Sequence, residues 1–382
     1  MATANPYIVI TTINAPSTAV QAFAARPGTR LIVVGDRKTP SNWGCDGVEY
    51  LPATAQPTLG FRVTNALPWN HYCRKNVGYL QALRQGATTI IDTDDDNLPY
   101  DDWAFPPFEG MHTLSPTERG FVNIYANFTT QRIWPRGFPL ERLRDPLATL
   151  HEDELRRRPC RVGVWQGLAD DDPDVDAIYR LTDNTPCRFT RRHPLVLATG
   201  TVCPFNSQNT ATRRELAALL YMPAFATPRF TDILRGLVAQ PVLWAAGYQL
   251  GFLHASVSQQ RNPHNYLVDF EAEIPCYRHA QRVIEVAREA VSSQTDVRTN
   301  LRRAYAALVG AGVADPRELP VLDAWLTDVA ELTTTVPAPA AADTATAATT
   351  ITDATTADTT TADSTTTVTD TPVTVAAGAA WV

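Results

Sequence analysis

The segment Thr88–Asp96, TTIIDTDDD, joins a β-branched, apolar run to a cluster of carboxylates. β-Branched residues favour strands, so Thr88–Asp92 is expected to form a buried strand. Asp94 and Asp96 stand two residues apart, so in an extended segment their side chains project to the same side. Adjacent carboxylates repel one another unless a cation neutralises them. The segment predicts an Mg²⁺ or Mn²⁺ site at a strand end, with a solvated acidic turn as the alternative.

The residues before this segment alternate between expected strands and helices. The strands are Tyr7–Thr12, Leu31–Val34 and Val48–Leu51; the helices are Ser17–Ala25, capped by Ser17, and Asn70–Gln85, with Asn70 as N-cap and Gly86 just past its end. Apolar strands separated by helices indicate a parallel sheet that is covered on both faces. In such sheets ligands bind beyond the carboxyl ends of the strands, which is where Asp36 and Asp94–Asp96 stand.

The rest of the chain divides into less regular parts. From Phe121 to Phe270 the sequence is rich in Pro and aromatic residues, with a helix expected from Thr231 to Gly247. Two or three amphipathic helices are expected from Cys276 to Leu332, the last opening at Asp315-Pro316. We therefore predict an α/β domain over 1–275, a helical cap over 276–332 and a tail over 333–382.

Composition narrows the classes of protein. The last 50 of the 382 residues hold 19 Thr and 5 Asp but no Lys or Arg, which predicts a disordered tail. Without the tail, 35 of the 40 acidic residues face 33 basic ones, and this near-neutral balance argues against non-specific nucleic-acid binding. No stretch reaches the ~18 apolar residues of a membrane span. The start, MATANPYIVITT, lacks the basic region of a signal peptide, so a soluble, cytoplasmic protein is expected.

Several polar residues outside the acidic triplet are candidates for a site, each with a structural alternative. Asp36 is suited to accept hydrogen bonds from a base or ribose, or to start a turn. Arg74 and Lys75, at the start of the helix before the acidic segment, are suited to clamp a diphosphate or a carboxylate, or to form a solvated helix face. Asp232 begins a helix, either as its cap or as a general base for an attacking hydroxyl.

A second acidic run and one histidine complete the candidates. Residues 170–176, DDDPDVD, are expected to form a loop in which Asp170–Asp172 are solvated. Asp174 and Asp176 remain open as sugar ligands. Among the seven His, His264 is flanked by polar residues and is a candidate metal ligand, although a lone His is more often structural.

An ordered set of motifs resembles the STELLO glycosyltransferase family. The motifs are GDRKTPSNW (35–43), LGFR (59–62), LPWNHYCRKNVGY (67–79), IDTDDD (91–96), WPRGFPLE (134–141), QGL (166–168) with PDVD (173–176), NSQNT (206–210) and DILRG (232–236). The resemblance covers roughly residues 5–330. A more distant similarity is to the reversibly glycosylated polypeptides, the UDP-arabinopyranose mutases.

The resemblance implies a GT-A-like, Rossmann-like sheet that binds UDP-sugars with Mn²⁺ or Mg²⁺. By motif match, Asp94 and Asp96 would bind metal and diphosphate, and Asp36 the uridine. The further candidates for nucleotide-sugar binding are Lys38, Arg62, Asp95, Asp174 and Asp176. In the mutase-like relatives an Arg becomes glycosylated at the position that Lys75 holds here, and Lys cannot reproduce that chemistry.

We therefore predict a metal-dependent glycosyltransferase that moves a sugar from a UDP-sugar to an unknown glycan, protein or small-molecule acceptor. Asp232, Arg74 and Lys75 are the predicted catalytic residues; Asp94, Asp96 and His264 are the predicted metal ligands. One alternative is a UDP-sugar mutase, which would yield a ring-contracted UDP-sugar rather than free UDP. The other is a non-catalytic binding partner on the same fold, which would bind no UDP-sugar.

Overall fold

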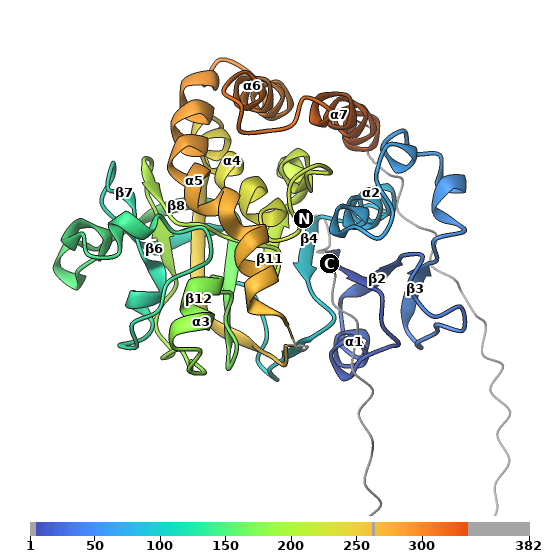
Figure 1. Ribbon diagram of the computed structural model, residues 1–382, viewed down its shortest axis with the longest axis horizontal. Helices are drawn as coiled ribbons and strands as arrows, with labels where there is room; N and C mark the ends of the chain where they lie inside the picture. Colours follow the sequence, from blue (N-terminus) through green and yellow to red (C-terminus); the bar gives the residue numbers. More distant parts are fainter. Residues whose placement is uncertain (1–4, 262–263, 335–382) are drawn as a thin grey trace, which may run out of the picture.

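The computed structural model describes residues 5–261 and 264–334, and a large mixed sheet forms its centre (Figure 1). Its strands follow in the order β3 (Val48–Leu51), β2 (Arg30–Gly35), β1 (Pro6–Thr12), β4 (Thr89–Thr93), β11 (Asn209–Arg213), β8 (Arg156–Asp170), β6 (Glu109–Leu114), β9 (Leu195–Leu197), β12 (Gln249–Gln259) and β5 (Asn97–Pro99). β8 also pairs with β12. A small second sheet joins β7 (Gly120–Phe121) to β10 (Thr201–Val202).

The first four strands confirm the predicted parallel arrangement. β1 lies between β2 and β4 and pairs with both in parallel, and β2 pairs in parallel with β3. The carboxyl ends of β2, β1 and β4 therefore lie side by side at one edge of the sheet. Beyond β4 the sheet is mixed, because β11 joins β4 in the antiparallel direction.

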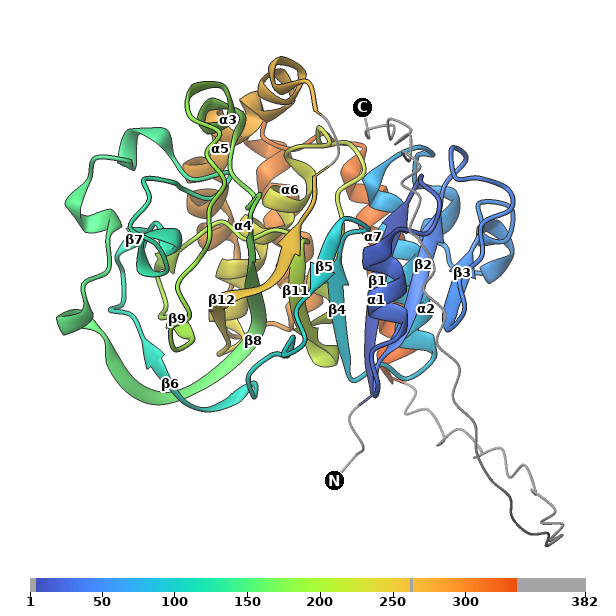
Figure 2. The same ribbon diagram turned by 90° about the horizontal axis from the view of Figure 1, so that it is seen from below.

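Helices cover both faces of the parallel strands, as predicted. α1 (Thr18–Ala24) lies on one face and α2 (Lys75–Arg84) on the other (Figures 1 and 2). Successive side chains of β1 point to opposite faces of the sheet. Ile8 therefore belongs to the apolar cluster that contains α1, and Val9 to the cluster that contains α2. The remaining helices are α3 (Ala177–Thr182), α4 (Thr231–Ala245), α5 (Tyr266–Ala290), α6 (Val297–Gly310) and α7 (Glu318–Thr334). Short 3₁₀ turns are formed by Gln56–Leu59, Val63–Asn65, Tyr72–Arg74, Ile124–Asn127, Leu140–Arg142, Pro146–Ala148, Glu152–Glu154 and Arg214–Leu220.

The two predicted helix starts have different outcomes. Ser17 caps α1 as predicted, since its hydroxyl accepts a hydrogen bond from the Val20 N–H. The prediction that Asn70 is the N-cap of the next helix is wrong. Its φ of 51° places it in the left-handed region, as Asn often is in turns. His71 caps the 3₁₀ turn that leads into α2, and Gly86, with a φ of 83°, follows the helix as predicted.

The C-terminal helices lie on the α2 side of the sheet. α5 runs through residue 276, where the start of the helical cap was expected, and packs against α4 and α6. α7 begins two residues after Pro316, close to the predicted position. Of the predicted tail, Thr333 and Thr334 end α7, and 335–382 lie outside the described residues. No helix in the described part of the chain is both long and apolar enough to cross a membrane.

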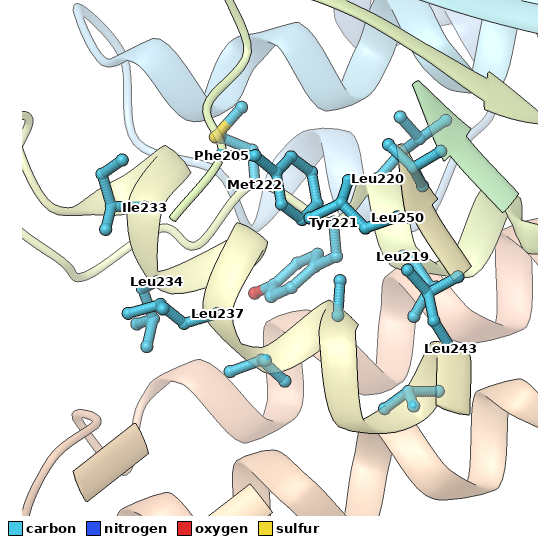
Figure 3. Close-up of a cluster of buried hydrophobic side chains, with 14 of the residues drawn as sticks. Phe205, Leu219, Leu220, Tyr221, Met222, Ile233, Leu234, Leu237, Leu243 and Leu250 are labelled. Carbon is cyan, nitrogen blue, oxygen red and sulfur yellow. The ribbon is translucent and has the colours of Figure 1, made fainter. Parts of the chain in front are cut away.

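Apolar packing fixes α4, the helix whose first turn carries the candidate residue Asp232. Leu234, Leu237 and Leu243 of α4 are buried in a cluster with Leu219 and Leu250, from the 3₁₀ turn before α4 and from β12 (Figure 3). Each buried leucine contributes roughly 1.5–3 kcal/mol relative to full exposure. The start of α4 is therefore held firmly above the sheet.

The contact of α2 with β1 and β2 predicts the effect of one substitution. A Cβ on Gly78 would lie 2.5 Å from Val9 and 2.7 Å from Val34, so Gly78→Ala is expected to lower the free energy of unfolding by about 1–3 kcal/mol. Gly310→Ala is the matched control, because a Cβ there meets no atom within 4 Å and should be neutral or stabilise by up to about 1 kcal/mol. Denaturant unfolding of both variants tests this packing. Equal stability of the two would contradict it.

Candidate active site

A cavity of about 150 Å³ opens at the carboxyl ends of β1 and β4. One part of its wall carries the acidic triplet Asp94–Asp96, and another carries three arginines. The lining residues are Thr11, Asn14, Tyr72, Asp94, Asp95, Asp96, Arg136, Asp174, Asn206, Gln208, Pro228, Arg229, Asp232, Gln259, Arg261 and His264. The strand-end location predicted for the site is thus the location of this cavity.

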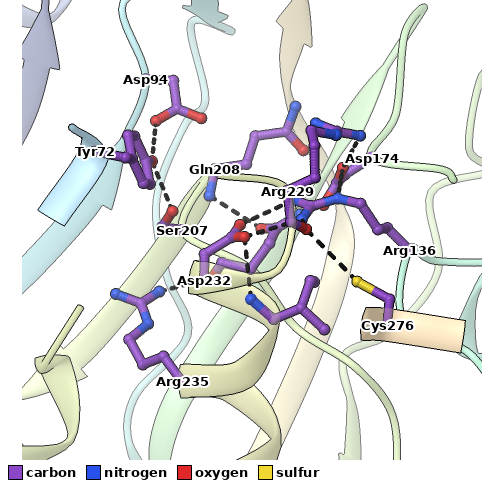
Figure 4. A network of polar contacts seen from close by, with 12 residues as sticks. Tyr72, Asp94, Arg136, Asp174, Ser207, Gln208, Arg229, Asp232, Arg235 and Cys276 are labelled. Atoms are coloured by element: carbon purple, nitrogen blue, oxygen red, sulfur yellow. Dashed lines mark hydrogen bonds and ion pairs between the residues drawn. The ribbon is translucent and has the colours of Figure 1, made fainter. Parts of the chain in front are cut away.

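Asp94 is held from behind by α2 and by the 3₁₀ turn before it. Its Oδ1 accepts hydrogen bonds from the Tyr72 hydroxyl at 2.6 Å and from Lys75 Nζ at 3.0 Å. The Tyr72 oxygen also lies 2.6 Å from Ser207 Oγ (Figure 4). Burial raises the pKa of Asp94 above its ordinary value, against the opposing charge of Lys75.

Lys75 is wholly buried and belongs to a charge network beneath the cavity. Its Nζ lies 2.6 Å from Asp92 Oδ1 and donates to the Thr93 carbonyl at 2.7 Å. Asp92 also accepts hydrogen bonds from Tyr79 at 2.6 Å and from Arg235 at 2.7 Å. Burial lowers the pKa of Lys75, but the two aspartates outweigh burial and hold that pKa above its ordinary value. Two cations therefore balance the charges of Asp92 and Asp94.

Asp95 and Asp96 point to different surroundings. Asp95 accepts hydrogen bonds from the Thr12 hydroxyl and the Asn14 amide, beside β1. Asp96 Oδ2 accepts one from Gln259 at 3.1 Å. Its Oδ1 is buried and has no hydrogen-bond partner among the described residues. Burial, with the charges of Asp94 and Asp95, raises the pKa of Asp96 to about 7.

The paired carboxylates fit the divalent cation that the family resemblance implies. Asp94 and Asp96 both line the cavity, and the unpartnered Oδ1 of Asp96 is a hard oxygen of the kind Mg²⁺ and Mn²⁺ prefer. In residues 5–261 and 264–334, no three His, Cys, Asp or Glu side chains gather into a metal-holding group. His264 lines the same cavity, but its Nδ1 lies 3.1 Å from Asp269. A cation on the two aspartates would therefore take its other oxygen ligands from substrate or water.

Arg136 joins two carboxylates on another part of the wall (Figure 4). It donates to both oxygens of Asp174 at 2.8 Å and to both oxygens of Asp232 at 3.0 Å. Nη2 of Arg229 lies 3.8 Å from Oδ1 of Asp174 and 2.8 Å from Oε1 of Glu273. Burial opposes ionisation of Asp174, but Arg136 and Arg229 outweigh it and hold the pKa of Asp174 below its ordinary value. Such bidentate pairs fix orientation as well as charge.

Two members of the second acidic run have structural partners. Asp176 lies outside the cavity wall, where it caps α3 by accepting from the Tyr179 N–H at 2.9 Å and also accepts from the Trp134 indole N–H at 2.6 Å. The prediction that Asp170 is solvated is wrong. β8 extends to this residue and buries it, and its carboxylate accepts from Tyr100 and Phe189.

Four other candidates lie away from the cavity wall. Arg74 is wholly buried, and its guanidinium donates to Gln56 and to backbone carbonyls rather than into the cavity. Arg62 forms ion pairs with Asp328 and Glu331 of α7. Asp36 directly follows β2 and accepts hydrogen bonds from two backbone N–H groups, and Lys38 lies in the turn after it. The structure thus gathers Asp94, Asp95, Asp96, Asp174, Asp232 and His264, with Lys75 directly behind Asp94.

Several cavity residues were not among the sequence candidates. They are Arg136, Asn206, Gln208, Arg229, Gln259 and Arg261. Arg136, Asn206 and Gln208 do fall inside the quoted motifs WPRGFPLE and NSQNT, which is the signal that could have drawn attention to them. Gln259 and Arg261 stand at the end of β12, a strand that the sequence analysis did not identify.

Comparison with known proteins confirms the family resemblance. A family model described as STELLO glycosyltransferases matches residues 229–361. Two proteins of Arabidopsis thaliana, "Probable glycosyltransferase STELLO1" and "Probable glycosyltransferase STELLO2", are 29% and 28% identical to this chain over 262 residues. Each match covers 63% of this chain and 34% of the relative, so the matched region spans about a third of each relative's length.

The network beneath Asp94 predicts a large difference between the two lysines of the chain. Lys75→Met leaves the buried Asp92 and the partly buried Asp94 with less compensating charge, so the free energy of unfolding should fall by about 3–5 kcal/mol. Lys38→Met changes a residue in a turn at the surface and should alter the free energy of unfolding by no more than about 0.5 kcal/mol. Denaturant unfolding measures both. A Lys75→Met protein as stable as Lys38→Met would show that the network carries no such energy.

Proposed function

We propose that this chain, a relative of the STELLO glycosyltransferases, is a metal-dependent glycosyltransferase that takes its sugar from a UDP-sugar. The observation that carries the proposal is the pair Asp94 and Asp96, which line one cavity at the end of a parallel strand. Ligands of open α/β sheets bind at such strand ends. The proposal includes a GT-A-like role for the parallel strands β1–β4 as the nucleotide-binding half.

In the proposed reaction Asp94 and Asp96 would hold the cation beside the donor's diphosphate. The bound cation supplies positive charge that stabilises the departing nucleoside diphosphate. Asp94 and Asp96 thus position the donor's diphosphate at the carboxyl end of β4. The unpartnered Oδ1 of Asp96 supports this assignment, since buried carboxylate oxygens normally have a partner.

Lys75 enters the proposal as a positioning residue rather than as a clamp on the substrate. It is absent from the cavity wall, and its amine contacts Asp92, Asp94 and the Tyr72 hydroxyl. Its charge opposes the effect of burial on the pKa of Asp94, and its hydrogen bond helps to fix the orientation of that carboxylate. Arg74, which donates to Gln56 and to backbone carbonyls, takes no part in the proposed chemistry.

Asp232 is the proposed general base for the acceptor hydroxyl, if the transfer inverts the anomeric centre. It begins α4 and faces the cavity, where Arg136 fixes its orientation. Its Oδ2 accepts one hydrogen bond from the described residues, that of Arg136, so a lone pair remains to receive a proton.

The mutase alternative is disfavoured by the surroundings of Lys75. A residue that carries a sugar must present a free nucleophile to the cavity, whereas the Lys75 amine is wholly buried and charged between two carboxylates. Chromatography of the products separates the two reactions, because a transferase releases free UDP and a mutase releases an isomeric UDP-sugar.

Thermal unfolding of the full chain with UDP tests the donor half of the proposal. With Mn²⁺ and UDP at about a hundredfold excess over Kd, binding should add about 2.7 kcal/mol of stability and raise Tm by roughly 2–8 °C. EDTA, Asp94→Asn or Asp96→Asn should abolish the rise, because each removes the cation or one of its ligands. Asp101→Asn, at an exposed acid outside the cavity wall, should retain it. An undiminished rise in both site variants would remove the metal assignment.

A further inference from the structure

The side chain of Trp69 lies against two arginines that differ in how firmly they are held. The Cζ of Arg74 lies 3.8 Å from the centroid of the Trp69 ring, and the Cζ of Arg37 lies 4.7 Å from it. Arg74 is wholly buried and anchored by Gln56 and the carbonyls of Thr64 and Leu67. Arg37 is exposed, and its guanidinium makes no hydrogen bond or ion pair with any described residue. Only the contact with Arg37 is therefore free to be exchanged for another flat group.

Trp69 lies outside the cavity wall, near the carboxyl end of β2, the strand next to β1. Two residues further on, the His71 N–H donates to the Asp36 carboxylate at 3.2 Å, and Asp36 directly follows β2. β1 separates β2 from β4, so Asp36 and Asp94 are two strand spacings apart, roughly 10 Å. That separation suits a molecule with a nucleoside at one end and a diphosphate at the other.

An unpartnered hydroxyl lies between these two ends. Thr11 is near the end of β1, lines the cavity and is 4% exposed. Its Oγ1 is buried and has no hydrogen-bond partner among the described residues. Buried polar groups are nearly always satisfied, so this hydroxyl points to a polar group of a ligand that crosses the end of β1.

We propose that Trp69 is the stacking platform for the base of the bound nucleoside diphosphate, and that Arg37 takes the place of the base in the free protein. Thr11 then faces the ribose, and the diphosphate extends to Asp94. The inference rests on the proposed function, which it deepens by assigning the base-binding residue. Every base has a π face, so stacking supplies affinity without requiring a particular hydrogen-bond pattern. A guanidinium is planar as well, which explains how Arg37 fills the same position.

Calorimetric titration of the full chain with UDP and with inorganic pyrophosphate, both with Mn²⁺, tests the assignment. Trp69→Leu keeps an apolar group beside Arg74 but removes the π face, so UDP should bind roughly tenfold more weakly while pyrophosphate binds as before. Trp69→Phe should retain most of the UDP affinity. Arg37→Ala removes the competing group and should tighten UDP binding about two- to fivefold.

Trp244→Leu is the matched control, because Trp244 is also partly buried with an arginine near its ring, Arg288 at 5.9 Å, but lies near the C-terminal end of α4 rather than beside the end of β2. Its UDP affinity should equal that of the unsubstituted protein. Unchanged UDP binding by Trp69→Leu would overturn the inference. An equal loss of UDP and pyrophosphate would also overturn it, since Trp69 would then act through the surrounding structure. If the unsubstituted protein binds pyrophosphate but no nucleotide, or binds neither, the proposed function fails and the inference with it.

Discussion

The burial of Lys75 beside Asp92 is the interaction on which the rest of the site depends. A buried charge without a partner costs several kcal/mol, so Lys75 of α2, Asp92 of β4 and Arg235 of α4 must come together in one arrangement. Asp94 follows Asp92 by two residues and shares the lysine, which places its carboxylate at the cavity wall. The ion pairs that join β4 to α2 and α4 therefore also position Asp94, the candidate metal ligand.

A second charged group completes the cavity from the other half of the chain. Arg136 fixes Asp174 and Asp232 at once, and the buried leucines of α4 hold Asp232 in place beneath it. The cavity thus has one wall built by β1 and β4 and another built by segments after residue 130. Such a division suits the proposed transfer, in which the diphosphate departs from one side of the sugar while the acceptor's hydroxyl approaches from another.

Local patterns in the sequence predicted local structure, but they did not predict side-chain contacts between distant parts of the chain. The strand and acidic run of Thr88–Asp96 were predictable because strand preference and carboxylate spacing act over a few residues. The prediction that Asn70 caps the helix failed because the neighbouring His71 caps the 3₁₀ turn that leads into α2. The bonds of Arg136 span 38 and 96 residues along the chain, to Asp174 and Asp232, and no local pattern predicts contacts of that length. Motif resemblance indicated the region of the sheet where the cavity lies, without giving these partners.

The most direct test of the account is a crystal structure of the full chain with UDP and Mn²⁺ bound. We expect a cation held by Asp94 and Asp96, with the diphosphate at the carboxyl end of β4 and Lys75 still paired with Asp92. A nucleotide bound elsewhere on the molecule would contradict it. So would a nucleotide in the cavity without a cation on these two carboxylates, because the acidic triplet would then have another purpose.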